Sequence, residues 1–186
     1  MTREDAVKIL EEMVENINLR KHMICVGACL KEYASILNED QVLWEIAGLL
    51  HDADWEKYPD KHPEVIVSKL RSLGESELAD AIASHGYGLG GTENRFTVKP
   101  KTKLDLYLRA CDEISGFVIA CSLVRPDKLD TLEVSSVKKK LKNKAFAAKV
   151  DRDFIYLSVR EAGLDLDKHI QVVIDVLRGI KTEIFG

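Results

Sequence analysis

Apolar residues recur along most of the chain with the spacing of amphipathic helices. Val42, Ile46 and Leu49 lie three or four residues apart, on one face of a helix that Asp40 can cap. The same periodicity predicts further helices at 2–18, 20–37, 64–73, 75–85, 103–124, 152–162 and 164–184. We find no strand pattern of alternating apolar and polar residues. The sequence therefore predicts an all-α protein, a single-domain helical bundle over residues 1–186.

Residues that cap or break helices mark the ends of these segments. Thr2 and Thr102 are placed to cap the helices that follow them, and Gly74 and Gly163 separate neighbouring helices. The segment 85–100 has four glycines and no periodicity, which predicts a flexible loop or a lid. It lacks the lysine and the spacing of a nucleotide-binding loop.

Composition and charge narrow the class of protein. With 186 residues, 46% of them hydrophobic and 31% charged, the chain suits one globular domain with a single core. Its net charge of −4 argues against nucleic acid as a partner of the whole surface. We see no signal peptide and no apolar run that could span a bilayer, so we expect a cytoplasmic protein without a membrane partner. The four cysteines form no CxxC pair, and we expect buried, reduced thiols.

A histidine and an aspartate, His51 and Asp52, stand side by side at the end of the helix that Asp40 caps. At a fraying last turn both side chains can bend toward one cation, and imidazole nitrogen and carboxylate oxygen suit a divalent transition metal. An isolated pair of this kind can equally be a histidine on the helix dipole beside a solvated aspartate. The pair by itself leaves both interpretations open.

Other residues of the same chemistry lie on neighbouring helices. His22 shares an apolar helix face with Val26 and Leu30, so it is either a hydrogen-bonded core residue or part of a site. His62 precedes Pro63, and His85 ends a predicted helix. A further candidate is Asp112.

Asp112 lies in the apolar segment LYLRACDEISGF, where a carboxylate needs a metal, a salt bridge or several donors to remain ionised. Arg109 lies one turn before Asp112 on the same helix face. Asp112 is therefore either a metal ligand or the partner of Arg109.

The order His22, then His51 and Asp52, then Asp112 resembles the HD superfamily of metal-dependent phosphohydrolases. The segments HDADWEKYPDKHPE, DEISG and SVKKKLKNKAFAAKVDR extend the similarity to a small group of stand-alone HD hydrolases, over roughly residues 15–170. The resemblance implies a helical bundle of the HD-domain type, with a motif core at about 15–125 and a C-terminal helical extension at about 126–186.

The resemblance also implies a ligand set. Histidines between the HD pair and the last aspartate resemble the branch of the superfamily that holds two metals. In that arrangement Asp52 bridges two ions, the first bound by His22, His51 and Asp112 and the second by His62 and His85. In a one-ion version His62 and His85 contact the phosphate or the leaving group. Manganese, iron, cobalt, nickel and zinc all suit these ligands.

The catalytic acid and the phosphate-binding cations are less defined. Many HD enzymes have a polar residue three positions after the HD aspartate, where this chain has Trp55. We therefore expect the catalytic group beside Asp52 to be Asp54 or Lys57, with Glu56 as a further candidate and His85 in a one-ion site. The expected phosphate-binding cations near His22 and in the lysine-rich stretch are Arg20, Lys21, Lys139, Lys140 and Lys144. Each of them can instead be a solvated surface charge.

The predicted function is that of a metal-dependent phosphohydrolase, either a phosphomonoesterase or a phosphodiesterase, acting on a small phosphorylated molecule such as a nucleotide. Two alternatives remain from the residues and the resemblance. One is an oxygenase with a two-iron site of the HD type, and the other is a non-catalytic binder of a phosphorylated ligand, in which Trp55 marks lost chemistry. Substrate, metal and oligomeric state are not specified by the sequence.

Overall fold

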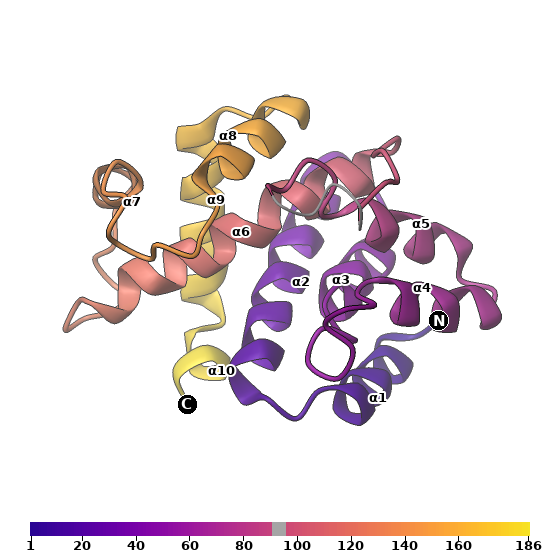
Figure 1. Ribbon diagram of the computed structural model, residues 1–186. Helices are drawn as coiled ribbons and strands as arrows, with labels where there is room; N and C mark the ends of the chain where they lie inside the picture. The colour runs from indigo at the N-terminus through magenta and orange to yellow at the C-terminus, as the bar shows by residue number, and fades with distance from the viewer. Residues whose placement is uncertain (91–95) are drawn as a thin grey trace.

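The computed structural model describes residues 1–90 and 96–186, and this part of the chain forms ten α-helices and no strand (Figure 1). The helices are α1 (Arg3–Met13), α2 (Ile17–Leu37), α3 (Gln41–Leu50), α4 (Glu64–Ser72), α5 (Ser76–Ser84), α6 (Lys103–Leu123), α7 (Val134–Leu141), α8 (Arg152–Glu161), α9 (Leu166–Gly179) and α10 (Lys181–Phe185). The predicted all-α fold is confirmed. None of the described helices combines the length and apolarity that crossing a membrane requires.

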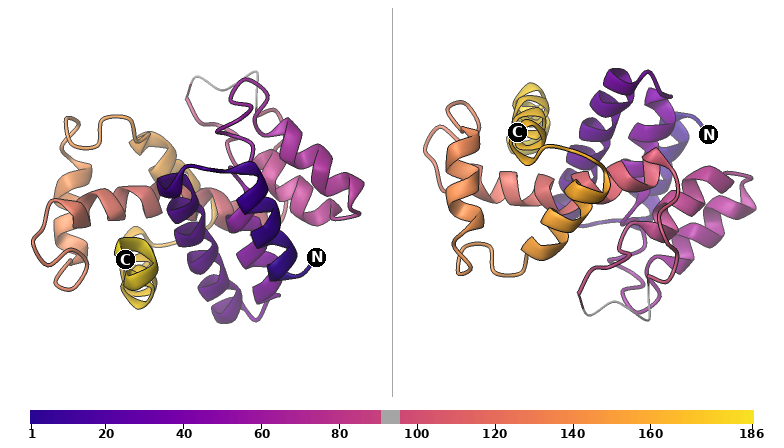
Figure 2. Two further views of the ribbon diagram at one scale, coloured as in Figure 1. Left: turned by 90° about the horizontal axis from the view of Figure 1, so that it is seen from below. Right: turned by 90° about the horizontal axis from the view of Figure 1, so that it is seen from above.

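Helices α2 and α6 form the centre of the bundle. Helix α2 packs against α3, α6 and α9, while α1 covers α3 and α4 pairs with α5 (Figure 1). Helices α7, α8 and α9 pack against α6, and α7 lies at the opposite end of α6 from α4 and α5 (Figure 2). The buried side chains of these helices form one continuous apolar cluster, and all four cysteines are buried free thiols, as predicted.

Helix caps explain where the sequence prediction succeeded and where it was wrong. Asp40 and Thr102 cap α3 and α6 through backbone N–H groups, as predicted. The first helix ends at Met13 rather than near residue 18, because the side chain of Asn16 accepts hydrogen bonds from the first turn of α2. The predicted last helix divides at Ile180 into α9 and α10.

Two glycines bring α2 and α3 into backbone contact. A Cβ atom on Gly48 would overlap the backbone nitrogen of Gly27, and a Cβ on Gly27 would lie 2.9 Å from the carbonyl oxygen of Glu45. Only glycine allows two helices to approach so closely at this point. The contact lies one turn before His51, which is the C-cap of α3.

A buried histidine joins three helices on the other side of α2. The Nε2–H of His169 donates to the carbonyl oxygen of Ala110 at 2.9 Å, which leaves Nδ1 to accept from the hydroxyl of Tyr33 at 2.5 Å. His169 is fully buried, and burial lowers the pKa of its imidazole to about 4. The ring is therefore a neutral tether between α2, α6 and α9.

We predict that Gly48→Ala destabilises the fold, because the new methyl group has to displace the backbone of α2. The expected loss in the free energy of unfolding is about 1 to 3 kcal/mol or more, measured by urea denaturation. Gly179→Ala is the matched control, since no atom lies within 4 Å of the added Cβ. A Gly48→Ala variant as stable as the wild type would contradict the close helix contact.

We predict that His169 makes stability fall with acidity. Its folded-state pKa of about 4 lies below the ordinary value of 6.5, so the unfolded chain binds the proton more readily. Stability from this residue is complete above pH 6.5 and decreases as pH falls toward 4. Between pH 7 and 5 the expected loss is about 2 kcal/mol. In urea titrations at the two pH values, His169→Gln should lose less free energy of unfolding between pH 7 and 5 than the wild type. An equal loss in both proteins would disprove the low pKa of His169.

Candidate metal centre

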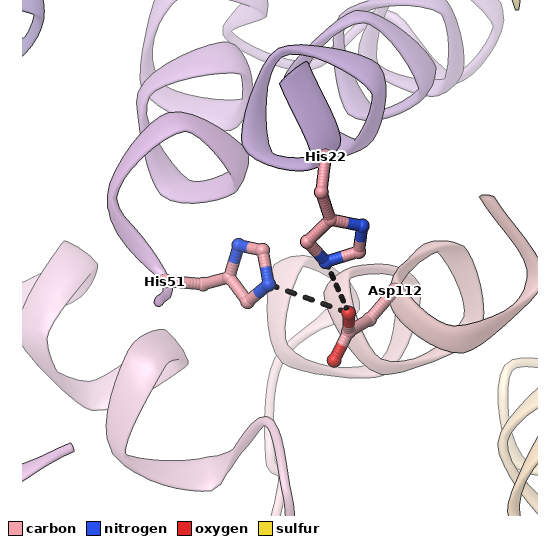
Figure 3. A group of neighbouring side chains, drawn as sticks. All are labelled: His22, His51 and Asp112. Carbon is pink, nitrogen blue, oxygen red and sulfur yellow. Dashed lines mark hydrogen bonds and ion pairs between the residues drawn. The ribbon is translucent and has the colours of Figure 1, made fainter. Parts of the chain in front are cut away.

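Three residues from three helices meet around one carboxylate oxygen. His22 on α2, His51 at the end of α3 and Asp112 on α6 point toward one another in Figure 3. The Nε2 atoms of His22 and His51 lie 3.0 Å and 3.3 Å from Oδ1 of Asp112. We call these residues the first cluster. One ligand atom from each lies within 4.8 Å of the others, so the group can hold a metal ion.

A second cluster adjoins the first and consists of Asp52, His62 and His85. The Nε2 atoms of His62 and His85 lie 3.3 Å and 3.6 Å from Oδ1 of Asp52. The other oxygen of Asp52, Oδ2, lies 3.5 Å from Nε2 of His51 in the first cluster. Asp52 therefore directs one carboxylate oxygen toward each cluster.

The outer ring nitrogens of three histidines are all occupied by hydrogen bonds. Nδ1–H of His51 donates to the carbonyl oxygen of Gly48 at 2.9 Å, and Nδ1–H of His85 donates to that of Ile82 at 2.6 Å. Nδ1–H of His62 donates to Oδ1 of Asp54 at 2.6 Å. In the neutral rings, Nε2 then carries the lone pair and faces the clusters, as in metal-binding histidines.

The inward-facing atoms fit a cation. Nε2 of His51 is buried without a hydrogen-bond partner, although it faces oxygens of Asp52 and Asp112. Nε2 of His62 and Nε2 of His85 lie only 3.3 Å apart. Lone pairs and carboxylate oxygens at these separations repel one another unless a positive charge lies between them. Histidine nitrogen and aspartate oxygen are donors that divalent transition metals accept.

Electrostatics keeps the carboxylates ionised. Burial raises the pKa of Asp112, but His51 and His22 outweigh it and hold that pKa well below the usual range. The pKa of Asp52 is likewise lowered, because the effects of His51 and His85 outweigh that of burial. Burial disfavours a charged His51, yet the carboxylates of Asp52 and Asp112 raise its pKa to about 9. Two half-buried anions therefore attract positive charge to the centre.

Arg109 is not the partner of Asp112, which resolves an alternative that the sequence left open. The guanidinium of Arg109 is fully buried; it pairs with Glu161 of α8 and donates to the carbonyl oxygen of Tyr87 at 2.5 Å. It also lies over the ring of Phe154, 5.3 Å from the ring centre. Arg109 thus joins α6 to α8 and to the segment after His85, and leaves Asp112 to the histidines.

The two catalytic candidates beside the HD pair do not reach the cavity. Asp54 is fully buried, and in addition to His62 it accepts backbone N–H bonds from Val65 and Ile66 at 3.0 Å and 2.9 Å. It orients His62 at the start of α4. Lys57 points away, toward α1, and donates to the carbonyl oxygen of Glu12 at 2.9 Å. The turn after α3 folds back on α1, which the local sequence did not reveal.

The cations expected to bind phosphate also lie elsewhere. Arg20 donates to the carbonyl oxygens of Val14 and Glu11 at 2.6 Å and 3.1 Å, and so closes the end of α1. Lys21 is half-buried beside His22 but does not line the cavity. Lys139 and Lys140 are on α7, which lies at the other end of α6 (Figure 2), and Lys144 is exposed, three residues after α7. No described lysine or arginine lines the cavity at the clusters.

A cavity of about 230 Å³ opens beside the two clusters. Its walls include Trp55, Phe96, Phe154 and the carboxyl group of Glu113. Burial, followed by the charge of Asp112, raises the pKa of Glu113 to about 8. Glu113 was not expected in the site from the sequence, although its position next to Asp112 in an apolar helix was an available signal. No local signal marked Phe96 or Phe154, which tertiary packing brings to the cavity.

Comparison with known proteins matches the chain to a protein family. The family model described as HD domain matches residues 19–116, a range that includes every residue of both clusters. No curated protein and no solved structure matches the chain significantly. The similarity therefore covers α2 to the middle of α6 and leaves α1 and α7 to α10 outside the matched range.

We predict that Asp52→Ala abolishes metal binding, because this carboxylate faces both clusters. His85→Ala should remove at most one ion, since the first cluster keeps its three residues. Elemental analysis of protein purified without chelator measures the stoichiometry. Asp60→Ala is the control, as Asp60 is an exposed carboxylate of the same turn. Unchanged metal content in Asp52→Ala would refute the assignment.

Proposed function

The chain belongs to the HD-domain family, whose members are generally metal-dependent phosphohydrolases, and we propose that it hydrolyses a small phosphorylated molecule. The observation that carries the proposal is the position of Asp52, with one oxygen toward each of two clusters of ligand atoms. Two adjacent divalent ions would use that arrangement, bound by the six residues that the sequence analysis named. They are His22, His51, Asp52, His62, His85 and Asp112.

Bound divalent cations supply Lewis-acid chemistry, in which a phosphoryl oxygen is polarised and water is made more acidic near neutral pH. The protein supplies the geometry. Asp54 fixes the ring of His62, and the carbonyl oxygens of Gly48 and Ile82 fix the rings of His51 and His85. These bonds hold each Nε2 atom toward the centre before any ligand arrives, which lowers the reorganisation needed.

The cavity walls favour one orientation of the substrate. The phosphoryl group lies toward the clusters, and the leaving group lies against the rings of Trp55, Phe96 and Phe154. Among the described residues of the cavity, Glu113 is the carboxyl group that belongs to neither cluster. We assign it the contact with the leaving group, in place of Asp54 and Lys57.

The cations that the sequence suggested for phosphate binding do not line this cavity. Since Arg20 and Lys57 are engaged with α1, the described residues leave the negative charge of the phosphoryl group to the metal ions. A small phosphorylated molecule is therefore the proposed substrate, either a phosphomonoester or a phosphodiester.

We predict phosphate release from a panel of phosphomonoesters and phosphodiesters by metal-loaded protein, at equal rates with and without oxygen. Glu113→Gln should lower kcat by about 10² fold or more, because a positioned acid contributes that much, and should leave the metal content unchanged. Asp153→Asn is the control, an exposed acid on α8 outside the cavity.

Two outcomes of that experiment would overturn the proposal. Turnover only with iron and oxygen would indicate an HD-type oxygenase with two irons. Saturable binding of phosphorylated ligands without turnover of any panel member would indicate a non-catalytic binder.

A further inference from the structure

A second cavity, of about 410 Å³, lies where the C-terminal end of α6 meets α7. We call it the basic cavity, because its lining includes three cationic side chains and no acidic one among the described residues. Its cations are Arg125, Lys139 and Lys140. The whole chain has a net charge of −4, so the charge of the basic cavity is opposite in sign to that of the chain as a whole.

The two lysines of the basic cavity differ from the lysine that precedes them on α7. No described carboxylate forms an ion pair with Lys139 or Lys140, whereas the preceding residue, Lys138, pairs with Asp167 at 2.7 Å. The ammonium group of Lys140 is instead held over the ring of Phe146, 4.5 Å from the ring centre. Of the three lysines within α7, Lys138 is therefore neutralised by a carboxylate, whereas the charges of Lys139 and Lys140 remain available to an anion from solution.

Arg125 is oriented by its own contacts. Its Nη2 donates to the carbonyl oxygen and to the hydroxyl of Thr131, at 3.1 Å and 2.5 Å. Its Nε lies 3.4 Å from Oδ1 of Asp127, which offsets part of its charge. Because these contacts fix the guanidinium plane, less side-chain freedom is lost when an anion binds there.

The lining of the basic cavity combines this charge with apolar and hydroxyl groups. Cys121, Val124 and Leu132 form apolar surface, and Ser136 adds a hydroxyl beside the lysines. A cavity of a few hundred Å³ with apolar walls and a few polar groups is typical of small-molecule sites. Lysine and arginine together are the groups that bind phosphate.

The basic cavity is separate from the metal centre. The two cavities share no lining residue, and α7 lies at the opposite end of α6 from α4 and α5 in both figures of the whole molecule (Figures 1 and 2). We propose that the basic cavity is a second binding site, for a small phosphorylated molecule with an apolar part. This proposal does not depend on the activity of the metal centre.

The test uses phenylphosphonate, which combines an anionic phosphonate with an apolar ring and has no ester bond to hydrolyse. Backbone amide NMR shifts of the metal-loaded protein are followed as the ligand is added. We expect saturable shifts in residues 121–143, at the end of α6 and in α7. Asp52→Ala should retain them, because the basic cavity lies away from the clusters.

Two double variants with the same change of charge identify the site. Lys139→Glu with Lys140→Glu should weaken binding at least about tenfold, since each charged hydrogen bond is worth more than a factor of ten. Lys142→Glu with Lys144→Glu should bind within about twofold of wild type, as both lysines are exposed and outside the cavity. If the first variant fails to fold, all four lysines are changed to glutamine instead, again in two pairs. Affinity for phenylphosphonate should then fall at least about threefold in the Lys139 and Lys140 pair and not in the other pair.

Several results would overturn the proposal. Amide shifts confined to the cavity beside the two clusters, or shifts that do not saturate, would show that the basic cavity binds no such ligand. Equal weakening in both double variants would indicate attraction to the general charge of the lysine-rich stretch. Binding of a single-stranded oligonucleotide, lost in the first variant, without binding of phenylphosphonate would assign the surface to nucleic acid instead.

Discussion

The backbone contact between α2 and α3 is the constraint on which the metal centre depends. Gly27 and Gly48 let the helices touch, and the rings of His22 and His51 consequently lie 5.2 Å apart, with T-shaped geometry. The carbonyl oxygen of Gly48 also accepts the proton of His51 Nδ1, so the same residue sets the distance between helices and the direction of the ring. A side chain at either glycine would separate the two histidines before it affected any ligand directly.

Buried charge is tolerated in this centre because each charged group has a defined partner. Asp112 and Asp52 face histidines, Asp54 receives three N–H donors, and Arg109 pairs with Glu161. An unpaired buried charge would cost several kcal/mol. The arrangement has two layers: the clusters point inward, and the outer hydrogen bonds prevent the rings from turning. Rigidity of the centre therefore comes from residues that lie outside the two clusters.

The segment between α7 and α8 contributes one lining residue to each of the two cavities. Asn143 lies at the basic cavity and Val150 at the metal cavity, and the guanidinium of Arg152 binds the carbonyl oxygens of both, at 3.2 Å and 2.9 Å. Arg152 also lies over the ring of Phe117 on α6. The lysine-rich stretch is a single basic run in the sequence, but it has two structural parts. Its first part lines the basic cavity, and its last part lines the cavity at the metal centre.

The sequence by itself determined most of the helices, though not α7, together with most of their caps and the six residues that meet in the two clusters. Periodicity and capping are local properties, and the order of histidines and aspartates specifies a known family of sites. Tertiary structure decided the rest. Whether Asp54 or Glu113 faces the cavity, whether Arg109 pairs with Asp112 or Glu161, and where Lys139 lies all depend on how helices pack. Long polar side chains reach partners far away in the chain, and the spacing of residues along one helix contains no information about those partners.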